Sequence, residues 1–261
     1  MPQASRAGAH RFPPPSAGSK ANFMTAPFHV LGDPAAPILI IADHASSAVP
    51  DGIDLGLPPE AFREHIALDI GVAEVAALLV GEGACCAILG GVSRLVIDYN
   101  REPDAAGLVP VHSDGHHIEG NSVVDVADRL ARFYDPYHAR VAALAAQPHR
   151  PFLLSLHSFT PRLRTRPEEA RPWEIGILYN ADDRGARIAI PLLESAGLAV
   201  GEQQPYSGKL LNATMNRHAE AHGRPYLGVE MRQDLVADAA GQRRFAQILA
   251  PVLDECRNGL A

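Results

Sequence analysis

Pro37-Ile38-Leu39-Ile40-Ile41-Ala42-Asp43-His44 is the stretch from which the fold can be predicted, because an apolar run ends there abruptly in polar residues. A run of this kind is typical of a strand that is buried on both faces of a parallel sheet. The stretch Phe152-Leu153-Leu154-Ser155-Leu156 has nearly the same character and is followed at once by His157 and Ser158. Further strands are predicted at residues 86–89, 95–98, 174–179 and 226–230.

The segments between these runs predict helices. From about residue 59 to residue 79, apolar side chains return to one side at helical spacing. Further helices are predicted at about residues 123–146, 184–196, 211–222 and 239–255. Strands and helices that alternate in this way indicate an α/β fold, with a mostly parallel or mixed central sheet and helices on both faces.

The chain divides into two parts by composition. Residues 28–261 contain no linker and are predicted to form a single α/β domain. Residues 1–27 are rich in Pro, Ala, Ser and Gly and lack apolar periodicity, so they are predicted to be a flexible N-terminal extension.

Composition excludes several classes of function. The net charge of −7 argues against a nucleic-acid-binding protein. No run of about 18 apolar residues is present, so no membrane span is expected. The 3 Cys residues show neither a disulfide framework nor the spacing of a cysteine zinc site. We therefore expect a cytoplasmic protein with a small-molecule partner, and the sequence leaves open whether it forms a homo-oligomer.

His44 and His157 are candidate metal ligands. Each follows an apolar strand, and in open α/β sheets the ligand site lies outside the carboxyl ends of the strands. Imidazole is the commonest protein ligand of transition metals, although each ring could instead cap its strand end by binding a backbone carbonyl. A catalytic zinc needs a third protein ligand, and we predict Asp69, which interrupts the apolar face of its predicted helix. Alternatively, Asp69 binds the second nitrogen of His44 or hydrogen-bonds backbone at the mouth of the site. Asp43 is the weaker candidate, because strand geometry would direct it to the opposite side.

Three further residues are candidates for substrate binding and catalysis. Arg101, beside Asn100, could hold an anionic substrate through its forked donors, or it could form a surface ion pair. Glu230 lies at or near a strand end, where it could act as general base toward a metal-bound water. Alternatively, Glu230 forms a salt bridge with Arg232. Asp98, three residues before Arg101, is expected to orient an arginine or to bind loop amides.

A cluster of histidines lies in a segment rich in Gly, Pro, Ser and Asp. His112, His116 and His117 could form either a surface cluster or a lid over the site. The chain contains no dinucleotide fingerprint and no phosphate-binding loop of the Gly–Lys–Ser/Thr type.

Four motifs occur together in one order, and with them the chain resembles the N-formylglutamate amidohydrolase family over roughly residues 28–236. They are Ala42-Asp43-His44-Ala45-Ser46-Ser47-Ala48-Val49-Pro50, Ser93-Arg94-Leu95-Val96-Ile97-Asp98-Tyr99-Asn100-Arg101, Ser155-Leu156-His157-Ser158-Phe159-Thr160-Pro161 and Val229-Glu230-Met231-Arg232-Gln233-Asp234.

The resemblance implies a carboxypeptidase/phosphorylase-like fold, related to zinc carboxypeptidases and to aspartoacylase-like deacylases. Those relatives bind zinc through a His, a Glu three residues later and a distant His. The first of these ligands matches His44, and the distant His matches His157. Position 47 is Ser, so the middle ligand does not carry over, and Asp69 is the substitute that we predict. The resemblance also implies that Arg101 and Asn100 bind a carboxylate of the substrate and that Glu230 is the general base. Ser158, which follows His157 directly, is predicted to bind substrate as well.

The predicted function is therefore a metal-dependent amidohydrolase, with Zn²⁺ as the expected cofactor. The resemblance implies an anionic N-acyl amino acid as substrate, with N-formyl-L-glutamate first, and a step of histidine degradation. Because Ser47 replaces the usual Glu, a non-catalytic small-molecule-binding protein of the same fold is an alternative. A deacylase with another N-acyl substrate is a third possibility.

Overall fold

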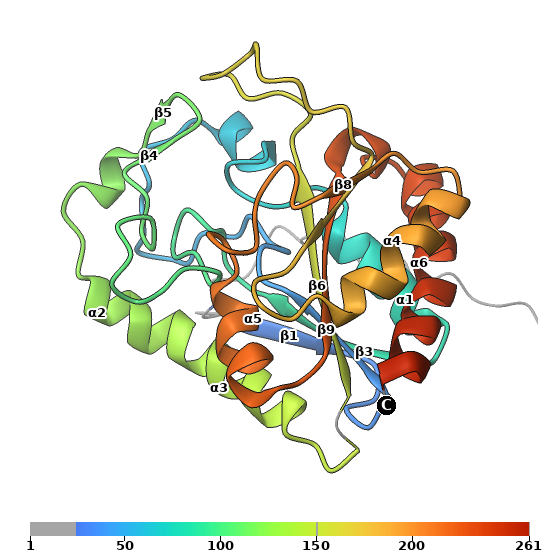
Figure 1. The fold of residues 1–261 in the computed structure, drawn as a ribbon. Helices are drawn as coiled ribbons and strands as arrows, with labels where there is room; N and C mark the ends of the chain where they lie inside the picture. Colours follow the sequence, from blue (N-terminus) through green and yellow to red (C-terminus); the bar gives the residue numbers. More distant parts are fainter. Residues whose placement is uncertain (1–24, 150, 261) are drawn as a thin grey trace, which may run out of the picture.

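The computed structural model describes residues 25–149 and 151–260 and contains a central seven-stranded mixed sheet (Figure 1). The strands are arranged in the order β1-β3-β2-β6-β9-β7-β8. Their bounds are β1 Phe28–Leu31, β2 Ile38–Ala42, β3 Cys85–Gly90, β6 Phe152–Phe159, β7 Ile175–Leu178, β8 Val200–Glu202 and β9 Tyr226–Arg232.

The middle of this sheet is parallel. Strands β3, β2, β6 and β9 run in one direction, so their carboxyl ends meet at one edge. The outer strands β1 and β7 run antiparallel to their neighbours β3 and β9, and β8 is parallel to β7. The predicted α/β fold with a mixed sheet is therefore confirmed.

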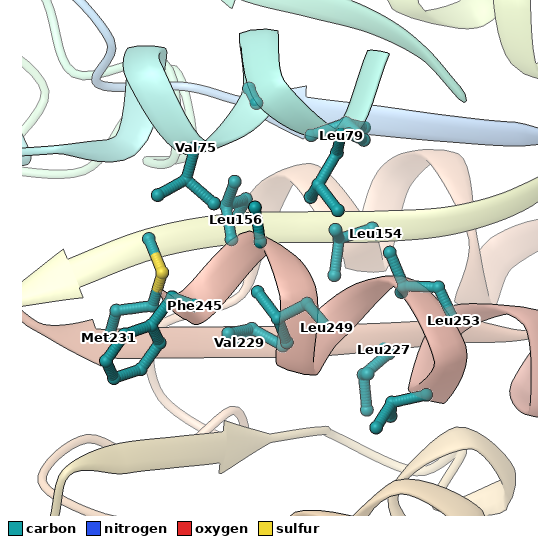
Figure 2. Close-up of a cluster of buried hydrophobic side chains, with 14 of the residues drawn as sticks. Val75, Leu79, Leu154, Leu156, Leu227, Val229, Met231, Phe245, Leu249 and Leu253 are labelled. Atoms are coloured by element: carbon teal, nitrogen blue, oxygen red, sulfur yellow. The ribbon is translucent and has the colours of Figure 1, made fainter. Parts of the chain in front are cut away.

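Three helices cover one face of the sheet: α1 (Val72–Gly81), α4 (Arg184–Ser195) and α6 (Ala239–Leu260). Alternate side chains of the central strands point toward them, as the period of two in a strand requires. Figure 2 shows this core where α1 and α6 pack on β6 and β9. Its labelled side chains are Val75, Leu79, Leu154, Leu156, Leu227, Val229, Met231, Phe245, Leu249 and Leu253.

The opposite face is covered by shorter helices and by long buried loops. The α-helices there are α2 (Val126–Arg129), α3 (Asp135–Ala145) and α5 (Ala213–His218), and a π-helical turn, η3 (Leu130–Tyr134), joins α2 to α3. A small hairpin, β4 (His112–Ser113) and β5 (His116–His117), stands apart from the main sheet. The remaining elements are 3₁₀ turns: η1 Pro59–Arg63, η2 Glu119–Asn121, η4 Glu220–His222 and η5 Gln233–Leu235.

The helix predicted over residues 59–79 is wrong in its first half. Only η1 forms at residues 59–63, and α1 begins at Val72. Gly71 precedes α1 with φ of 83°, and a Cβ there would lie 2.3 Å from the Val236 carbonyl oxygen. This left-handed residue ends the loop before the helix, and Asp69 therefore lies in a buried turn rather than on a helix face.

The strand predicted at residues 95–98 is also absent. Its apolar side chains are fully buried, but the segment consists of turns. A short apolar run indicates burial more reliably than it indicates strand geometry. The hydroxyl of Ser93 supports these turns by donating to the carbonyl of Ala67 over 2.8 Å.

Residues 1–24 of the predicted N-terminal extension lie outside the residues that the structure describes. Pro27, however, packs on the domain, since its carbonyl accepts hydrogen bonds from the Gly91 amide at 2.9 Å and from the Tyr99 hydroxyl at 2.7 Å. Among residues 25–149 and 151–260, no helix has both the length and the apolar character needed to cross a membrane.

Candidate active site

Two neighbouring strands carry His157 and Glu230 side by side. His157 in β6 and Glu230 in β9 are direct partners in the parallel register, and both lie on the face opposite α1, α4 and α6. His44 follows β2 by two residues, in a turn at the same edge of the sheet. The strand ends therefore bring together side chains that are far apart in sequence.

His44, Asp69 and His157 form a buried cluster of potential metal ligands. Oδ2 of Asp69 lies 2.7 Å from Nδ1 of His157 and 3.3 Å from Nδ1 of His44. One ligand atom from each residue lies within 4.8 Å of the other two. Two imidazoles and one carboxylate are a donor set that suits zinc.

The second nitrogen of each imidazole faces another carboxylate, which forms a hydrogen bond at His44 and a close ionic contact at His157. Nε2 of His44 lies 2.7 Å from Oδ1 of Asp98, and Nε2 of His157 lies 3.3 Å from Oδ2 of Asp43. Histidines that bind metals are commonly oriented in this way through the nitrogen that faces away from the metal. The cluster therefore has both the ligands and the outer supports of a metal centre.

Strand alternation predicts that Asp43 and His44 point to opposite sides of the sheet. In the structure, both side chains reach the site, and Oδ2 of Asp43 faces His157. Strand β2 ends at Ala42, and the turn that follows brings both residues into the site. Asp43 is fully buried, and its Oδ1 accepts hydrogen bonds from the Tyr137 hydroxyl at 2.7 Å and the Thr214 hydroxyl at 3.1 Å. It is thus placed to orient His157.

The buried charges of the site are consistent with a cation. Burial alone would lower the pKa of His157, but the nearby carboxylates of Asp43 and Asp69 outweigh it and raise this pKa well above its usual value. Burial likewise opposes ionisation of Asp69, but the positive charges of His44 and His157 lower its pKa. The carboxylates thus require positive charge nearby, which a divalent metal can supply while the imidazoles remain neutral.

Glu230 lies half-buried beside this cluster, and loss of hydration raises its pKa to about 7. Its Oε2 has no hydrogen-bond partner in the part of the chain that the structure describes. Arg232, which the sequence offered as an alternative ion-pair partner, binds Asp234 instead at 2.8 Å. Glu230 is therefore free to act on a water or a ligand.

Arg94 is a site residue to which the sequence assigned no role. Its Nη1 donates to Oδ1 of Asp69 over 3.2 Å, and its Nη2 donates to Oδ2 of Asp98 over 2.9 Å. Its position four residues before Asp98, in the motif that also contains Arg101, was the available signal. Asp98 does orient an arginine, as predicted, and it also binds His44.

The residues predicted to bind substrate all line the same cavity of about 150 Å³. Arg101 is only loosely engaged, with its Nε 3.9 Å from Oδ2 of Asp98. The amide oxygen of Asn100 accepts from the Thr214 backbone over 3.0 Å, which fixes the side chain. The hydroxyl of Ser158 donates to the Ile70 carbonyl over 2.9 Å, and its role in substrate binding stays a prediction.

A second cavity of about 350 Å³ adjoins the first. The two cavities share His65, Arg94, Asp98, Arg101 and Tyr206. The predicted histidine loop is the β4–β5 hairpin, which contributes His112, Ser113 and Asp114 to the wall of the second cavity. Sequence reasoning did not identify His65 or Tyr206, because each reaches the site from a loop.

Comparisons with known proteins agree with this architecture. The sequence model of the N-formylglutamate amidohydrolase family matches residues 36–237. The solved structure of the gene product Atu2144 from Agrobacterium tumefaciens is 30% identical, with a TM-score of 0.83 over 89% of this chain and 95% of that one. N-formylglutamate amidohydrolase from Ralstonia eutropha JMP134 is 20% identical, with a TM-score of 0.71 over 90% of this chain and 99% of that one.

Comparison with curated protein sequences gives no match. The family match nevertheless extends over most of the chain and includes all four sequence motifs. The chain belongs to the N-formylglutamate amidohydrolase family, a family of hydrolases that cleave amide bonds.

Proposed function

We propose that this protein is a metal-dependent hydrolase that converts N-formyl-L-glutamate into formate and L-glutamate. The observation that carries the proposal is the buried His44–Asp69–His157 cluster next to Glu230. The description of the matching family and the name of the relative from Ralstonia eutropha both support this substrate.

The metal that we propose is Zn²⁺, held by His44, Asp69 and His157. A zinc ion bound there would lower the pKa of a coordinated water and polarise the amide carbonyl of the substrate. Asp98 would fix the orientation of the His44 imidazole through the hydrogen bond of 2.7 Å to its second nitrogen. Asp43, whose Oδ2 lies 3.3 Å from the second nitrogen of His157, would orient the other ring.

Glu230 is proposed as the general base. Its carboxylate takes a proton from the attacking water, whose oxygen bonds to the formyl carbon. The same proton then passes to the leaving nitrogen as the carbon–nitrogen bond breaks, which gives formate and the free amine. A pKa of about 7 suits both steps near neutral pH, since the group can accept and return a proton.

Arg101 is proposed to bind a carboxylate of the substrate, with Asn100 beside it. Both line the cavity that also contains Glu230 and the His–Asp–His cluster. Holding the carboxylate there would place the amide against the reacting groups, and such positioning can lower a barrier by several kcal/mol. The adjoining cavity provides room for the amino-acid part of the substrate.

We further propose that the protein acts in the cytoplasm, in the step of histidine degradation that hydrolyses N-formylglutamate. Its proposed partner is the small anionic substrate, and neither nucleic acid nor membrane takes part. The sequence alternative of a non-catalytic binding protein was based on Ser47 in place of a Glu. Asp69 weakens that alternative, because it brings a carboxylate to both imidazoles.

Purified protein would test the proposal by metal analysis and by release of formate. We expect about one zinc per chain and formate production from N-formyl-L-glutamate, which a chelator abolishes and added Zn²⁺ restores. N-acetyl-L-glutamate and N-formyl-L-leucine show whether the acyl group or the amino acid is selected. Absence of hydrolysis of every N-acyl amino acid by the zinc-loaded protein would overturn the proposal.

A further inference from the structure

Tyr206 stands where the two cavities meet. It lies in the loop after β8, is half-buried and lines both cavities. Glu230 and Arg94 line the smaller cavity with it. The ring therefore lies beside the groups to which the reaction is assigned.

The hydroxyl of Tyr206 is oriented by Arg171. The side chain of Arg171 is buried, and its Nη1 donates a hydrogen bond to Oη of Tyr206 over 3.1 Å. The guanidinium carbon also lies 5.1 Å from the centre of the Tyr206 ring. Hydrogen bonds to the Thr160 carbonyl and to the Glu169 carboxylate hold Arg171 itself in place.

This contact determines the direction of the tyrosine proton. A guanidinium can only donate, so Oη of Tyr206 is the acceptor in the bond with Arg171. The hydroxyl proton must then point elsewhere, and among the described residues no hydrogen bond donated by this hydroxyl is found. Burial and the nearby charge of Glu230 raise the pKa of Tyr206, so this proton is retained at neutral pH. Tyr206 thus presents a directed and unused donor at the cavity.

We propose that Tyr206 is a catalytic residue that donates this hydrogen bond to the substrate's amide oxygen as negative charge develops on it. Arg171 is the positioning residue that directs the donor. The inference rests on the proposed function and adds a residue to its mechanism. Charge develops on this oxygen when water adds to the carbonyl carbon, and a fixed donor is most effective there because it needs no reorganisation.

Steady-state kinetics of Tyr206→Phe test the proposal. We expect kcat to fall by about 100-fold or more, the usual effect of losing one such donor, while KM stays within about twofold. Tyr179→Phe is the matched control, because the Tyr179 hydroxyl binds Glu202 and lies outside both cavities. An unchanged kcat, or an effect confined to KM, would overturn the role of Tyr206.

A double-mutant comparison tests Arg171. Arg171→Met should lower kcat in the same direction, and the variant with both substitutions should be no slower than Tyr206→Phe alone. Thermal melting checks that each variant folds, and Arg171→Lys should restore part of kcat because a lysine can still donate to Oη. If Arg171→Met lowers the kcat of Tyr206→Phe by its full single-mutant factor, Arg171 does not act through Tyr206.

A binding measurement separates this inference from the proposed function. Calorimetry would compare L-glutamate with an analogue in which tetrahedral phosphorus replaces the formyl carbon. Tyr206→Phe should weaken binding of the analogue by about 100-fold and leave L-glutamate unchanged, since only the analogue carries the transition-state charge. Equal affinity of the analogue for both proteins would overturn the inference.

The two proposals can also fail separately. If the wild-type enzyme hydrolyses a different N-acyl amino acid, the proposed substrate is wrong, and the same kinetic comparison on that substrate still tests Tyr206. If N-formyl-L-glutamate is hydrolysed equally fast by Tyr206→Phe and by wild type, the proposed function holds and this inference fails.

Discussion

Oδ2 of Asp69 lies 2.7 Å from Nδ1 of His157, although 88 positions separate the two residues. The strand that carries His157 and the turn that carries Asp69 are brought together because α1 packs on β6. The same oxygen lies 3.3 Å from Nδ1 of His44. Asp69 is thus the point at which both candidate ligands converge.

Replacing Asp69 should remove the metal. Loss of an outer support typically costs 10–100-fold in metal affinity, so Asp69→Ala, which removes a direct ligand, should cost more than about 100-fold. Competition with a chromogenic chelator measures the change, and Asp51→Ala is the control because Asp51 is exposed. Zinc affinity equal to that of wild type in Asp69→Ala would rule out the assignment.

Asp43 should influence the metal without binding it. Asp43→Asn weakens the support of the distal nitrogen of His157, so we expect zinc affinity to fall by about 10–100-fold. Zinc titration of the metal-free protein measures this, with circular dichroism to confirm the fold. Tyr137→Phe leaves Asp43 in place and removes only one of its donors, so its effect should be smaller. The reverse order of the two effects would contradict the role of Asp43.

Glu230→Gln should separate catalysis from metal binding. The amide keeps the size of the side chain but accepts no proton, so kcat should fall by about 100-fold or more with the zinc content unchanged. In the wild-type enzyme, kcat/KM should rise with pH as Glu230 ionises, and this acidic limb should disappear in the variant. Near-normal turnover by Glu230→Gln would show that another group is the base.

Arg101 should affect only substrates with a carboxylate. Hydrogen bonds to charged groups contribute about 1.5–3 kcal/mol, so Arg101→Met should lower kcat/KM for N-formyl-L-glutamate by about 10–100-fold. The rate with N-formylbutylamine, which has no carboxylate, should not change. Arg187→Met is the control, because Arg187 is exposed and pairs with Asp183. A similar loss with both substrates would point to a structural role for Arg101.

The core between β6 and α6 should carry much of the stability. Leu156 is fully buried there. Leu156→Ala should lower the free energy of unfolding by about 2–5 kcal/mol, the usual cost of truncating a buried leucine. Leu210 is 82% exposed, and Leu210→Ala should change the free energy of unfolding by at most about 0.5 kcal/mol. Urea unfolding of both variants tests this comparison, which would fail if the two losses were alike.

Much of the sheet could be predicted from the sequence, because buried parallel strands appear as continuous apolar runs. The same signal failed at residues 95–98, where turns rather than a strand bury the apolar side chains. Asp69 could be found because a carboxylate among apolar residues needs a partner, although the helix assigned to it was wrong. Its burial was the informative property, and its secondary structure was not.

Apart from Asp98, the supporting residues could not be predicted, because their contacts depend on loop conformation. Asp43 joins His157 only because the chain turns immediately after β2. Arg171 reaches Tyr206 across 35 positions, between two loops with no periodic pattern. Local sequence contains no signal for such contacts, whereas it does contain one for the buried strand that carries His157.

The pairing of His157 with Glu230 in the β6–β9 ladder has a consequence for engineering. Side chains alternate between the faces of a strand, so a slip of one residue would turn one of the two away from the other. Efforts to redirect the enzyme toward new amides should therefore leave these strands untouched and diversify the surrounding loops, including the β4–β5 hairpin and the segment around Tyr206. Libraries built on the strands themselves should yield mostly inactive proteins.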